Sequence, residues 1–170
     1  HTIGILKAYT TRVGNGPFPS EVDEFTAGHI RECGQEFGAT TGRPRRCGWL
    51  DLVALKYADE VSDFSSLIVT KLDILSKFKK IKVCVGYETV DGNKMEFVKN
   101  PDTLFKLNPI YKTFPGWKTD ITHCRTYEEL PNNAKKFLDY IEEFLETKIS
   151  GISVGPERSQ IIVRGIKDAD

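Results

Sequence analysis

The fold class is decided by residues 66–73, SLIVTKLD. The first five residues are a short, almost continuously apolar run, which is typical of a buried and often parallel strand. This run leads directly into Lys71 and Asp73. Ligands of α/β proteins bind at the carboxyl ends of such strands. The stretch therefore predicts a strand over 66–70 with polar groups at the end where a ligand would bind.

Strand and helix patterns alternate on both sides of this stretch, which predicts an α/β fold with mixed α+β character. The length of 170 residues fits a single domain, residues 1–170. We expect loops over 38–48 and short strands between loops over 100–127. Helices are predicted over 20–32 with Ser20 as the N-cap and Phe25 facing inward, from Leu50 to Val61, and from Pro131 to Leu145. Strands are predicted over 3–13 (one or a pair), 81–89, 95–98 after an Asp91-Gly92-Asn93 turn, 149–153 and 161–163.

The composition is that of an ordinary globular protein, with 39% hydrophobic and 28% charged residues. Lysine plus arginine and aspartate plus glutamate both number 24, and this balance argues against a general polyanion binder. No apolar run approaches the roughly 20 residues that would cross a bilayer. The four cysteines lack the spacing of a zinc knuckle or redox pair, so reduced thiols are favoured over two extracellular disulfides.

The start of the chain is unusual, because it has no methionine and enters strand-like sequence at once. Ile3-Gly4-Ile5-Leu6 follows His1 almost directly, whereas a complete protein usually begins with a polar, loosely ordered segment. We therefore expect the chain to be a piece of a longer protein.

A loop rich in glycine and arginine, residues 39–49, is a candidate anion site. Arginine binds carboxylate and phosphate through two parallel hydrogen bonds and stays charged. In an extended segment Arg43 and Arg45 would point to one side and Arg46 to the other. Composition alone favours a solvated basic loop or a nucleic-acid patch.

Two further motifs are weak when taken alone. In Thr70-Lys71-Leu72-Asp73, the carboxylate at the strand end suits the ring N–H and amino group of guanine, although such a pair also occurs by chance. In residues 151–158, GISVGPER, the glycines around Ser153 allow a ligand to approach the backbone closely, although the segment also fits an ordinary turn. Neither phosphate-binding glycine motif, G-x-x-x-x-G-K-[ST] or G-x-G-x-x-G, is present, and the three histidines lack metal-ligand spacing.

Together and in order, four segments resemble the carboxyl-terminal part of adenylosuccinate synthetase, from residue 3 to about residue 164. They are KAYTTRVGNGPFPSE (7–21), EFGATTGRPRRCGWLDL (36–52), TKLDIL (70–75) and GISVGPER (151–158). The resemblance implies a synthetase fold like that of the P-loop NTPases. It also implies a ligase that makes adenylosuccinate from IMP and L-aspartate, with GTP converted to GDP and phosphate and with Mg²⁺ as the metal.

The resemblance also implies roles for individual residues. Thr41 would bind the aspartate carboxylate, Arg43 would bridge aspartate and IMP, and Arg45 would reach both aspartate and GTP. The implied aspartate and IMP set is Ala39, Thr40, Thr41, Gly42, Arg43, Pro44, Arg45 and Val13, the last beside the IMP ribose. The implied GTP set is Arg45, Lys71, Leu72, Asp73, Ser153, Val154 and Gly155.

The family's phosphate loop, general base, general acid and Mg²⁺ ligands have no counterpart in this chain. We therefore expect no catalytic residue and no metal ligand here, and no synthetase activity from the chain alone. The resemblance implies a cytoplasmic homodimer, with no nucleic acid and no membrane as partner. A non-catalytic module that binds guanine nucleotides or anions remains the main alternative. An RNA-binding protein would need aromatic residues beside the arginines, where only Trp49 is close.

Overall fold

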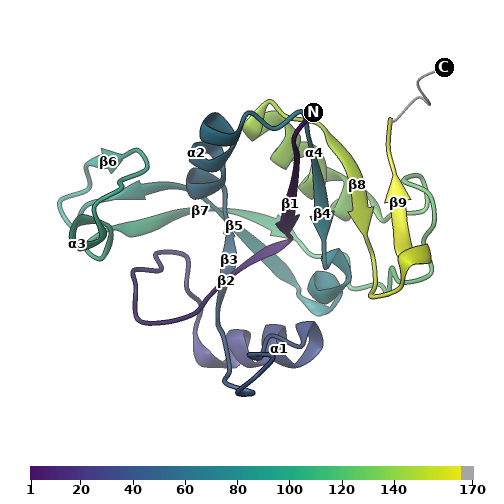
Figure 1. Cartoon of the computed structure of the whole chain (residues 1–170), viewed down its shortest axis with the longest axis horizontal. Coiled ribbons are helices and arrows are strands. Elements are labelled where there is room, and N and C mark those ends of the chain that lie inside the picture. The colour runs from purple at the N-terminus through teal and green to yellow at the C-terminus, as the bar shows by residue number, and fades with distance from the viewer. Residues whose placement is uncertain (166–170) are drawn as a thin grey trace. The chain divides into compact units, whose positions relative to one another are not determined.

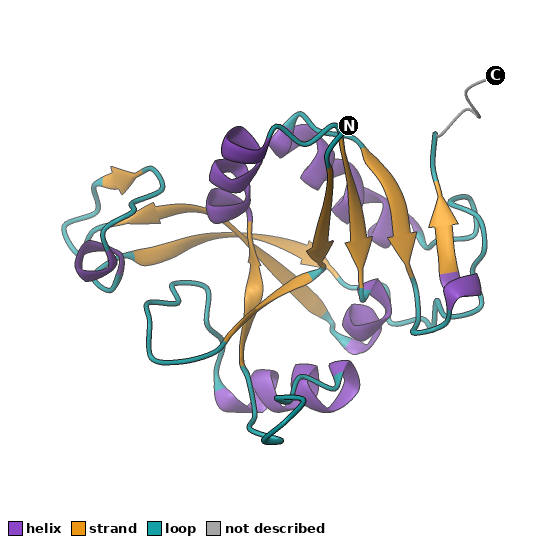
Figure 2. Ribbon diagram, viewed as in Figure 1, coloured by secondary structure: helices purple, strands orange, loops and turns teal. Residues whose placement is uncertain are grey.

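The computed structural model of the chain describes residues 1–165. Strands and helices alternate along the chain (Figures 1 and 2), which confirms the predicted mixed α/β fold class. The chain forms two compact units, and the expectation of a single domain over 1–170 stays a prediction. Unit 1 comprises His1–Ala8, Ala58–Ile81 and Phe114–Asp170, and unit 2 comprises Tyr9–Tyr57 and Lys82–Thr113.

Unit 1 is built on a four-stranded sheet with the order β1-β4-β8-β9. β4 is parallel to both β1 and β8, while β9 is antiparallel to β8. Thr70 at the end of β4 pairs with Lys7 at the end of β1, and Val69 pairs with Ile152 near the end of β8. The three parallel strands therefore end at one edge of the sheet. The strands are β1 (Ile3–Lys7), β4 (Ser66–Thr70), β8 (Ile149–Ser153) and β9 (Ile161–Val163).

The sequence patterns for this sheet are confirmed. The predicted strands over 66–70, 149–153 and 161–163 have the observed bounds. Leu67 and Val69 are completely buried, whereas their neighbours Ser66, Ile68 and Thr70 are half-buried. Alternate side chains point to opposite faces of a strand, so one face of β4 is the fully buried one.

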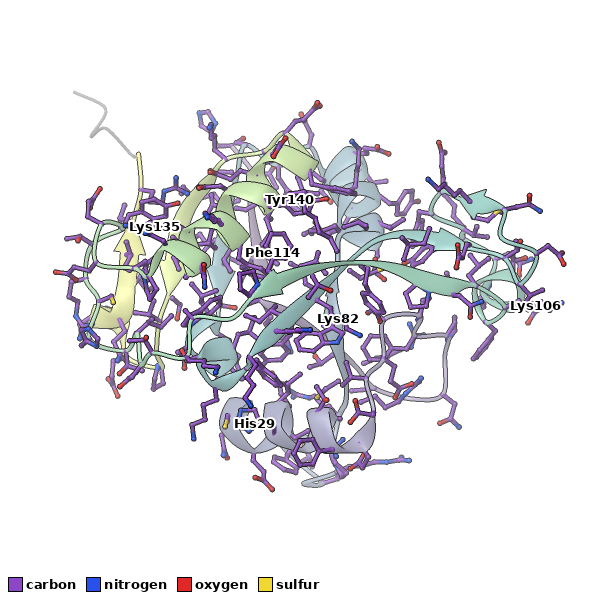
Figure 3. The ribbon with its side chains drawn as sticks, turned by 180° about the vertical axis from the view of Figure 1, so that it is seen from behind. His29, Lys82, Lys106, Phe114, Lys135 and Tyr140 are labelled. Carbon is purple, nitrogen blue, oxygen red and sulfur yellow. The ribbon has the colours of Figure 1, made fainter. Side chains whose placement is uncertain are left out.

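Helix α4 (Asn132–Leu145) lies along one face of this sheet, behind the strands in Figure 1 and in front of them in Figure 3. Pro131 precedes it, as predicted, because a fixed φ near −65° suits the start of a helix. Phe114 meets Phe137 edge to face at 5.9 Å and also packs against Tyr140, as Figure 3 shows for the second pair. The buried stripe of α4 is Ala134, Phe137, Leu138, Ile141 and Leu145.

Unit 2 is built on a second sheet with the order β2-β3-β5-β6, in which β7 also pairs with β5. β3 is antiparallel to β2 and parallel to β5, and β5 is antiparallel to β6. Residues 3–13, for which one strand or a pair was expected, form a pair, β1 of unit 1 and β2 of unit 2. The strands are β2 (Tyr9–Arg12), β3 (Arg46–Asp51), β5 (Lys80–Glu88), β6 (Lys94–Met95) and β7 (Asn108–Pro115), and α3 (Pro101–Leu104) lies between the last two in sequence.

The first predicted helix begins later than expected. α1 (Glu24–Gly34) is capped by Asp23, whose carboxylate accepts the N–H of Thr26 at 3.0 Å. Ser20 is not the cap, because its backbone carbonyl accepts the N–H of Trp49 and its side chain is buried. The prediction that Phe25 faces inward is wrong, since 92% of this residue is exposed.

The predicted start of the second helix, at Leu50, is wrong, because Leu50 lies in strand β3. The first residues of β3 were expected to belong to the loop over 38–48. Arg46 pairs with Arg12 of β2, and Leu50 pairs with Val83 of β5. α2 (Leu52–Ser62) begins directly after the strand. The Asp51 carboxylate accepts the N–H groups of Val53 and Ala54 there, and so starts the helix.

Two more predictions need correction. The return strand expected over 95–98 is only β6 (Lys94–Met95), because its ladder with β5 stops at the Tyr87–Met95 pair. The segment over 100–127 contains an eight-residue strand, β7, where only short strands were expected. Partners far away in sequence stabilise this strand, so the local pattern does not reveal it.

None of the four cysteines forms a disulfide. Among the described residues, no helix has the length and apolar character needed to cross a membrane.

Candidate functional site

The end of β4 holds the first group of candidate residues, Lys71, Leu72 and Asp73. Lys71 adopts the left-handed conformation, with φ 60°, and opens the 3-10 helix η1 (Leu72–Lys77). That conformation costs a residue with a side chain about 1–2 kcal/mol. Leu72 is completely buried, and its packing holds this reversal of the chain in place. The turn fixes Asp73 directly beyond the strand end.

Asp73 is a half-buried carboxyl, and burial raises its pKa above the ordinary value of 3.8. The positive charge of Lys71 acts against this shift, and the negative charge of Asp120 adds to it. The carboxylate interacts with its own backbone N–H, and residues 1–165 provide no other hydrogen bond or ion pair for it. A carboxylate held partly out of water in this way retains acceptor capacity for a ligand with N–H donors.

The end of β8 holds the second group, Ser153, Val154 and Gly155. The Ser153 hydroxyl donates to the carbonyl of Gly155 at 2.9 Å, which tightens the turn after the strand. Val154 is completely buried, and its N–H donates to the carbonyl of Gln160 at 2.9 Å. Gly155 is buried, and in the described part of the chain its N–H makes no hydrogen bond.

The structure brings these two groups to one edge of unit 1. Val69 of β4 pairs with Ile152 of β8, so the segments that follow both strands leave the sheet side by side. η1 also contacts β8. A carboxylate acceptor and the backbone N–H of Gly155 thus lie at the edge where the parallel strands end, which is where α/β proteins bind ligands. None of the single motifs predicted this proximity by itself.

The arginine loop belongs to unit 2 and closes on itself through its backbone. The N–H of Gly38 donates to the carbonyl of Arg43 at 2.8 Å, and the N–H of Arg45 donates to the carbonyl of Glu36 at 3.0 Å. This short antiparallel pairing places Arg43 and Arg45 on one face, as expected for an extended segment. Residues 39–44 between these contacts, namely Ala39, Thr40, Thr41, Gly42, Arg43 and Pro44, are all exposed.

Arg45 forms an ion pair that the sequence did not reveal. Its guanidinium donates to the Glu36 carboxylate at 2.7 Å, and Glu36 has no exposed surface. The hydroxyl of Tyr9 donates to the other Glu36 oxygen at 2.6 Å. A buried carboxylate is costly unless it is paired and hydrogen-bonded. Glu36 therefore anchors the base of the loop and fixes the direction of the Arg45 side chain.

Arg46 is also held by residues of unit 2. It pairs with Glu21 at 2.5 Å and donates to the carbonyls of Gly14 and Gly16, and so it fixes the loop that follows Val13. Val13 itself is 75% exposed. Arg43 differs from both other arginines, because its side chain has no hydrogen-bond or ion-pair partner among residues 1–165. The three neighbouring arginines thus divide into two structural anchors and one side chain open to an anion.

The described residues contain no group of three or more His, Cys, Asp or Glu side chains that could hold a metal ion.

The sequence did not predict the role of Glu36, although this residue lies within the quoted segment 36–52. The only available signal was an acidic residue nine positions before an arginine, which says nothing about burial.

Comparison with known proteins gives consistent matches. The profile of the family described as adenylosuccinate synthetase matches residues 1–162. Among curated proteins, adenylosuccinate synthetase of Clostridium botulinum (strain Eklund 17B / Type B) is 55% identical over 163 residues, covering 95% of this chain and 38% of that protein. The protein of the same name from Mycosarcoma maydis is 51% identical over 163 residues, covering 95% of this chain and 37% of the relative.

A solved structure also superimposes closely. It is described as fully ligated adenylosuccinate synthetase from Plasmodium falciparum, with a TM-score of 0.92 and 41% sequence identity. The match covers 96% of this chain and 39% of that one. The chain thus spans about 38% of the length of the curated relatives that it matches.

The raised pKa of Asp73 predicts a stability gain from its neutral replacement. The folded protein binds the proton more tightly than the unfolded chain, so the stability that the protonated Asp73 contributes to the wild type is present below the ordinary value of 3.8 and is lost as pH rises through the raised value. Asp73→Asn should therefore increase Tm at neutral pH by no more than about 4 °C, since solvent screens the half-exposed group. Near pH 3 the two proteins should melt together.

The control for this experiment is Asp91→Asn, which changes an exposed carboxylate in a turn. The measurement is the Tm of wild type and of both variants in thermal melts at a series of pH values. A lower Tm for Asp73→Asn than for wild type at neutral pH would contradict the assigned burial effect.

The Glu36–Arg45 pair predicts very different costs for two neighbouring arginines. Arg45→Leu leaves the Glu36 carboxylate buried without its ion pair, and breaking such a pair costs about 3–5 kcal/mol. Arg43→Leu changes an exposed side chain and should alter the free energy of unfolding by about 0.5 kcal/mol or less. Urea denaturation measures both variants, and equal destabilisation would contradict the anchoring role of Glu36.

Proposed function

Because the chain belongs to the adenylosuccinate synthetase family, we propose that it serves the reaction expected for that family. The reaction joins L-aspartate to IMP and converts GTP to GDP and phosphate. The chain covers about 38% of its relatives, so this activity is proposed for the intact protein. The placement of the chain toward the carboxyl end of the family's sequence stays a prediction.

The observation that carries the proposal is the shared edge of Asp73 and the segment Ser153–Gly155 in unit 1. Guanine has two adjacent N–H donors, the ring N1–H and the 2-amino group, and one carboxylate can accept from both. Asp73 retains that acceptor capacity beside the strand end. The guanine O6 needs a donor, and the N–H of Gly155 remains for it because Gln160 engages that of Val154.

Lys71 would complete recognition of the base. Its backbone geometry fixes Asp73, and its aliphatic stem would lie along the apolar face of the purine. Leu72 supports this turn from the core. Adenine presents an acceptor at N1 and lacks the 2-amino group, so the same carboxylate would be left facing a lone pair. The site therefore favours GTP over ATP.

The loop of unit 2 would bind L-aspartate and IMP. Arg43 offers an exposed guanidinium fork, and the Thr41 hydroxyl lies within 3.4 Å of the Arg43 N–H on the same turn. Both groups suit a carboxylate. Arg45 would use the donors that Glu36 leaves open, and Val13 would lie beside the IMP ribose.

We assign no bond-making step to this chain. We propose that the Mg²⁺ ligands belong to other parts of the intact protein; among residues 1–165 there is no group of three potential ligands. When bound in the intact protein, Mg²⁺ would stabilise charge on the GTP phosphates. We also propose that the intact protein is a cytoplasmic homodimer.

The isolated chain should not turn over IMP, aspartate and GTP, because it supplies binding groups only. A coupled phosphate-release assay on the chain alone tests this, with the intact protein as the positive control. Phosphate release above background by the chain would overturn the assignment.

Two substitutions in the intact protein test whether Asp73 serves GTP and Arg43 serves aspartate and IMP. Asp73→Asn should raise the KM for GTP and leave those for aspartate and IMP unchanged. Arg43→Leu should do the reverse, so each variant is the control for the other. Loss of a hydrogen bond to a charged group costs about 1.5–3 kcal/mol, or about 10- to 150-fold in affinity.

Steady-state kinetics with each substrate varied in turn measure these effects. An unchanged preference for GTP over ATP in Asp73→Asn would contradict the guanine site. A non-catalytic guanine-nucleotide or anion-binding module, the main alternative, would bind GTP but show no turnover in the intact protein.

A further inference from the structure

Gln160 joins three segments of unit 1, although no motif drew attention to it. It ends the 3-10 helix η2 (Arg158–Gln160), directly before β9. Its side-chain carbonyl accepts the N–H of Glu157 at 3.0 Å, and its side-chain NH₂ donates to the carbonyl of Thr122 at 2.9 Å. Its main-chain carbonyl accepts the N–H of Val154 at 2.9 Å. Both amide groups of the side chain are therefore engaged.

The contact with Gly155 explains why that position lacks a side chain. A Cβ on Gly155 would lie 2.3 Å from the side-chain oxygen of Gln160 and 2.5 Å from its nitrogen. Real Cβ contacts are not this short, so the Gln160 amide occupies the space that a side chain at residue 155 would need. Because both ends of the amide are hydrogen-bonded, it cannot move aside without losing these contacts.

Thr122 connects Gln160 to the neighbourhood of Asp73. The N–H of Thr122 donates to the Asp120 carboxylate at 2.9 Å. The negative charge of Asp120 acts on the Asp73 carboxyl. Gln160 thus ties the segment after β8 to the loop that carries Asp120.

We propose that Gln160 is a positioning residue for the guanine site, a role that rests on the proposed function. It does not touch the base. Its main-chain carbonyl engages the Val154 N–H, and its side-chain amide fills the space beside Gly155 and so fixes the direction of the remaining Gly155 N–H relative to Asp73. The donor for O6 and the acceptor for N1–H and the 2-amino group are held at one separation, which sets the preference for a 6-oxo-2-amino purine.

Substitution of Gln160 in the intact protein tests this role. Gln160→Met keeps the volume of the side chain and removes its hydrogen bonds, while Gln160→Ala empties the space. Both should raise the KM for GTP by about tenfold, because the Gly155 N–H loses its fixed direction and the hydrogen bond that it would donate to O6 of the base is lost. The values of kcat and the KM for aspartate should stay within about twofold of wild type. Ser159→Ala, an exposed neighbour on η2, is the matched control and should change neither.

A double-variant cycle separates this mechanism from general damage to the fold. Gly155→Ala should displace the Gln160 amide and give the same rise in KM as Gln160→Ala. The double variant should be no worse than either single variant, because both remove the same contact. Effects that multiply in the double variant would overturn the proposal, and so would equal increases in the KM values for GTP and aspartate.

The outcomes also distinguish this inference from the function on which it rests. A wild-type protein with no preference for GTP over ATP would defeat the proposed function itself. A wild-type preference for GTP that both Gln160 variants retain, with an unchanged KM, would defeat the positioning role alone.

Discussion

Parallel pairing of β4 with β1 and β8 is the constraint on which the candidate guanine site depends. Pairing in this direction brings segments 71–73 and 153–155, which are far apart in sequence, to a single edge of unit 1. Antiparallel pairing of β4 and β8 would have sent them to opposite edges. The buried apolar residues of β4 place this strand between β1 and β8. The position of β4 in turn determines where the polar residues that follow it can form a site.

The fully buried carboxylate of unit 2 and the half-buried carboxylate of unit 1 have different roles. In unit 2, Glu36 is fully buried and is satisfied by Tyr9 and Arg45, so its charge stabilises the base of the loop. In unit 1, Asp73 is half-buried without an ion-pair partner among the described residues, and its ionised form is disfavoured. The first arrangement is that of a structural anchor. The second is typical of a binding group, since residues that serve a ligand are often held at some cost to stability.

Local patterns predicted those elements that local interactions specify. The apolar run at 66–70 and the amphipathic stripe of α4 need no knowledge of distant partners, and both are confirmed. β3 was missed because its first residue, Arg46, joins the sheet only by pairing with Arg12. The same limit applied to β7, whose strand forms against β5 within a segment without periodicity.

For the site, the motifs and the family resemblance together predicted residues that would touch a ligand but not those that hold them in place. Asp73 and Gly155 come from motifs that are weak when taken alone. Glu36 and Gln160 act through partners nine or more positions away, Arg45 in one case and Thr122 in the other. An acidic or amide side chain gives no local sign that it will be buried or bridged, so only the folded chain reveals these roles.

In the proposed guanine site, the Asp73 carboxylate accepts hydrogen bonds from the N1–H and the 2-amino group of the base. Xanthine carries a carbonyl at the 2-position, so an amide at residue 73 would donate to xanthine where the carboxylate repels it. The direct measurement is the ratio of kcat/KM for XTP to that for GTP in the intact wild-type protein and in Asp73→Asn. Wild type should favour GTP, and the variant should favour XTP. The same preference for GTP in both proteins would contradict this role of Asp73.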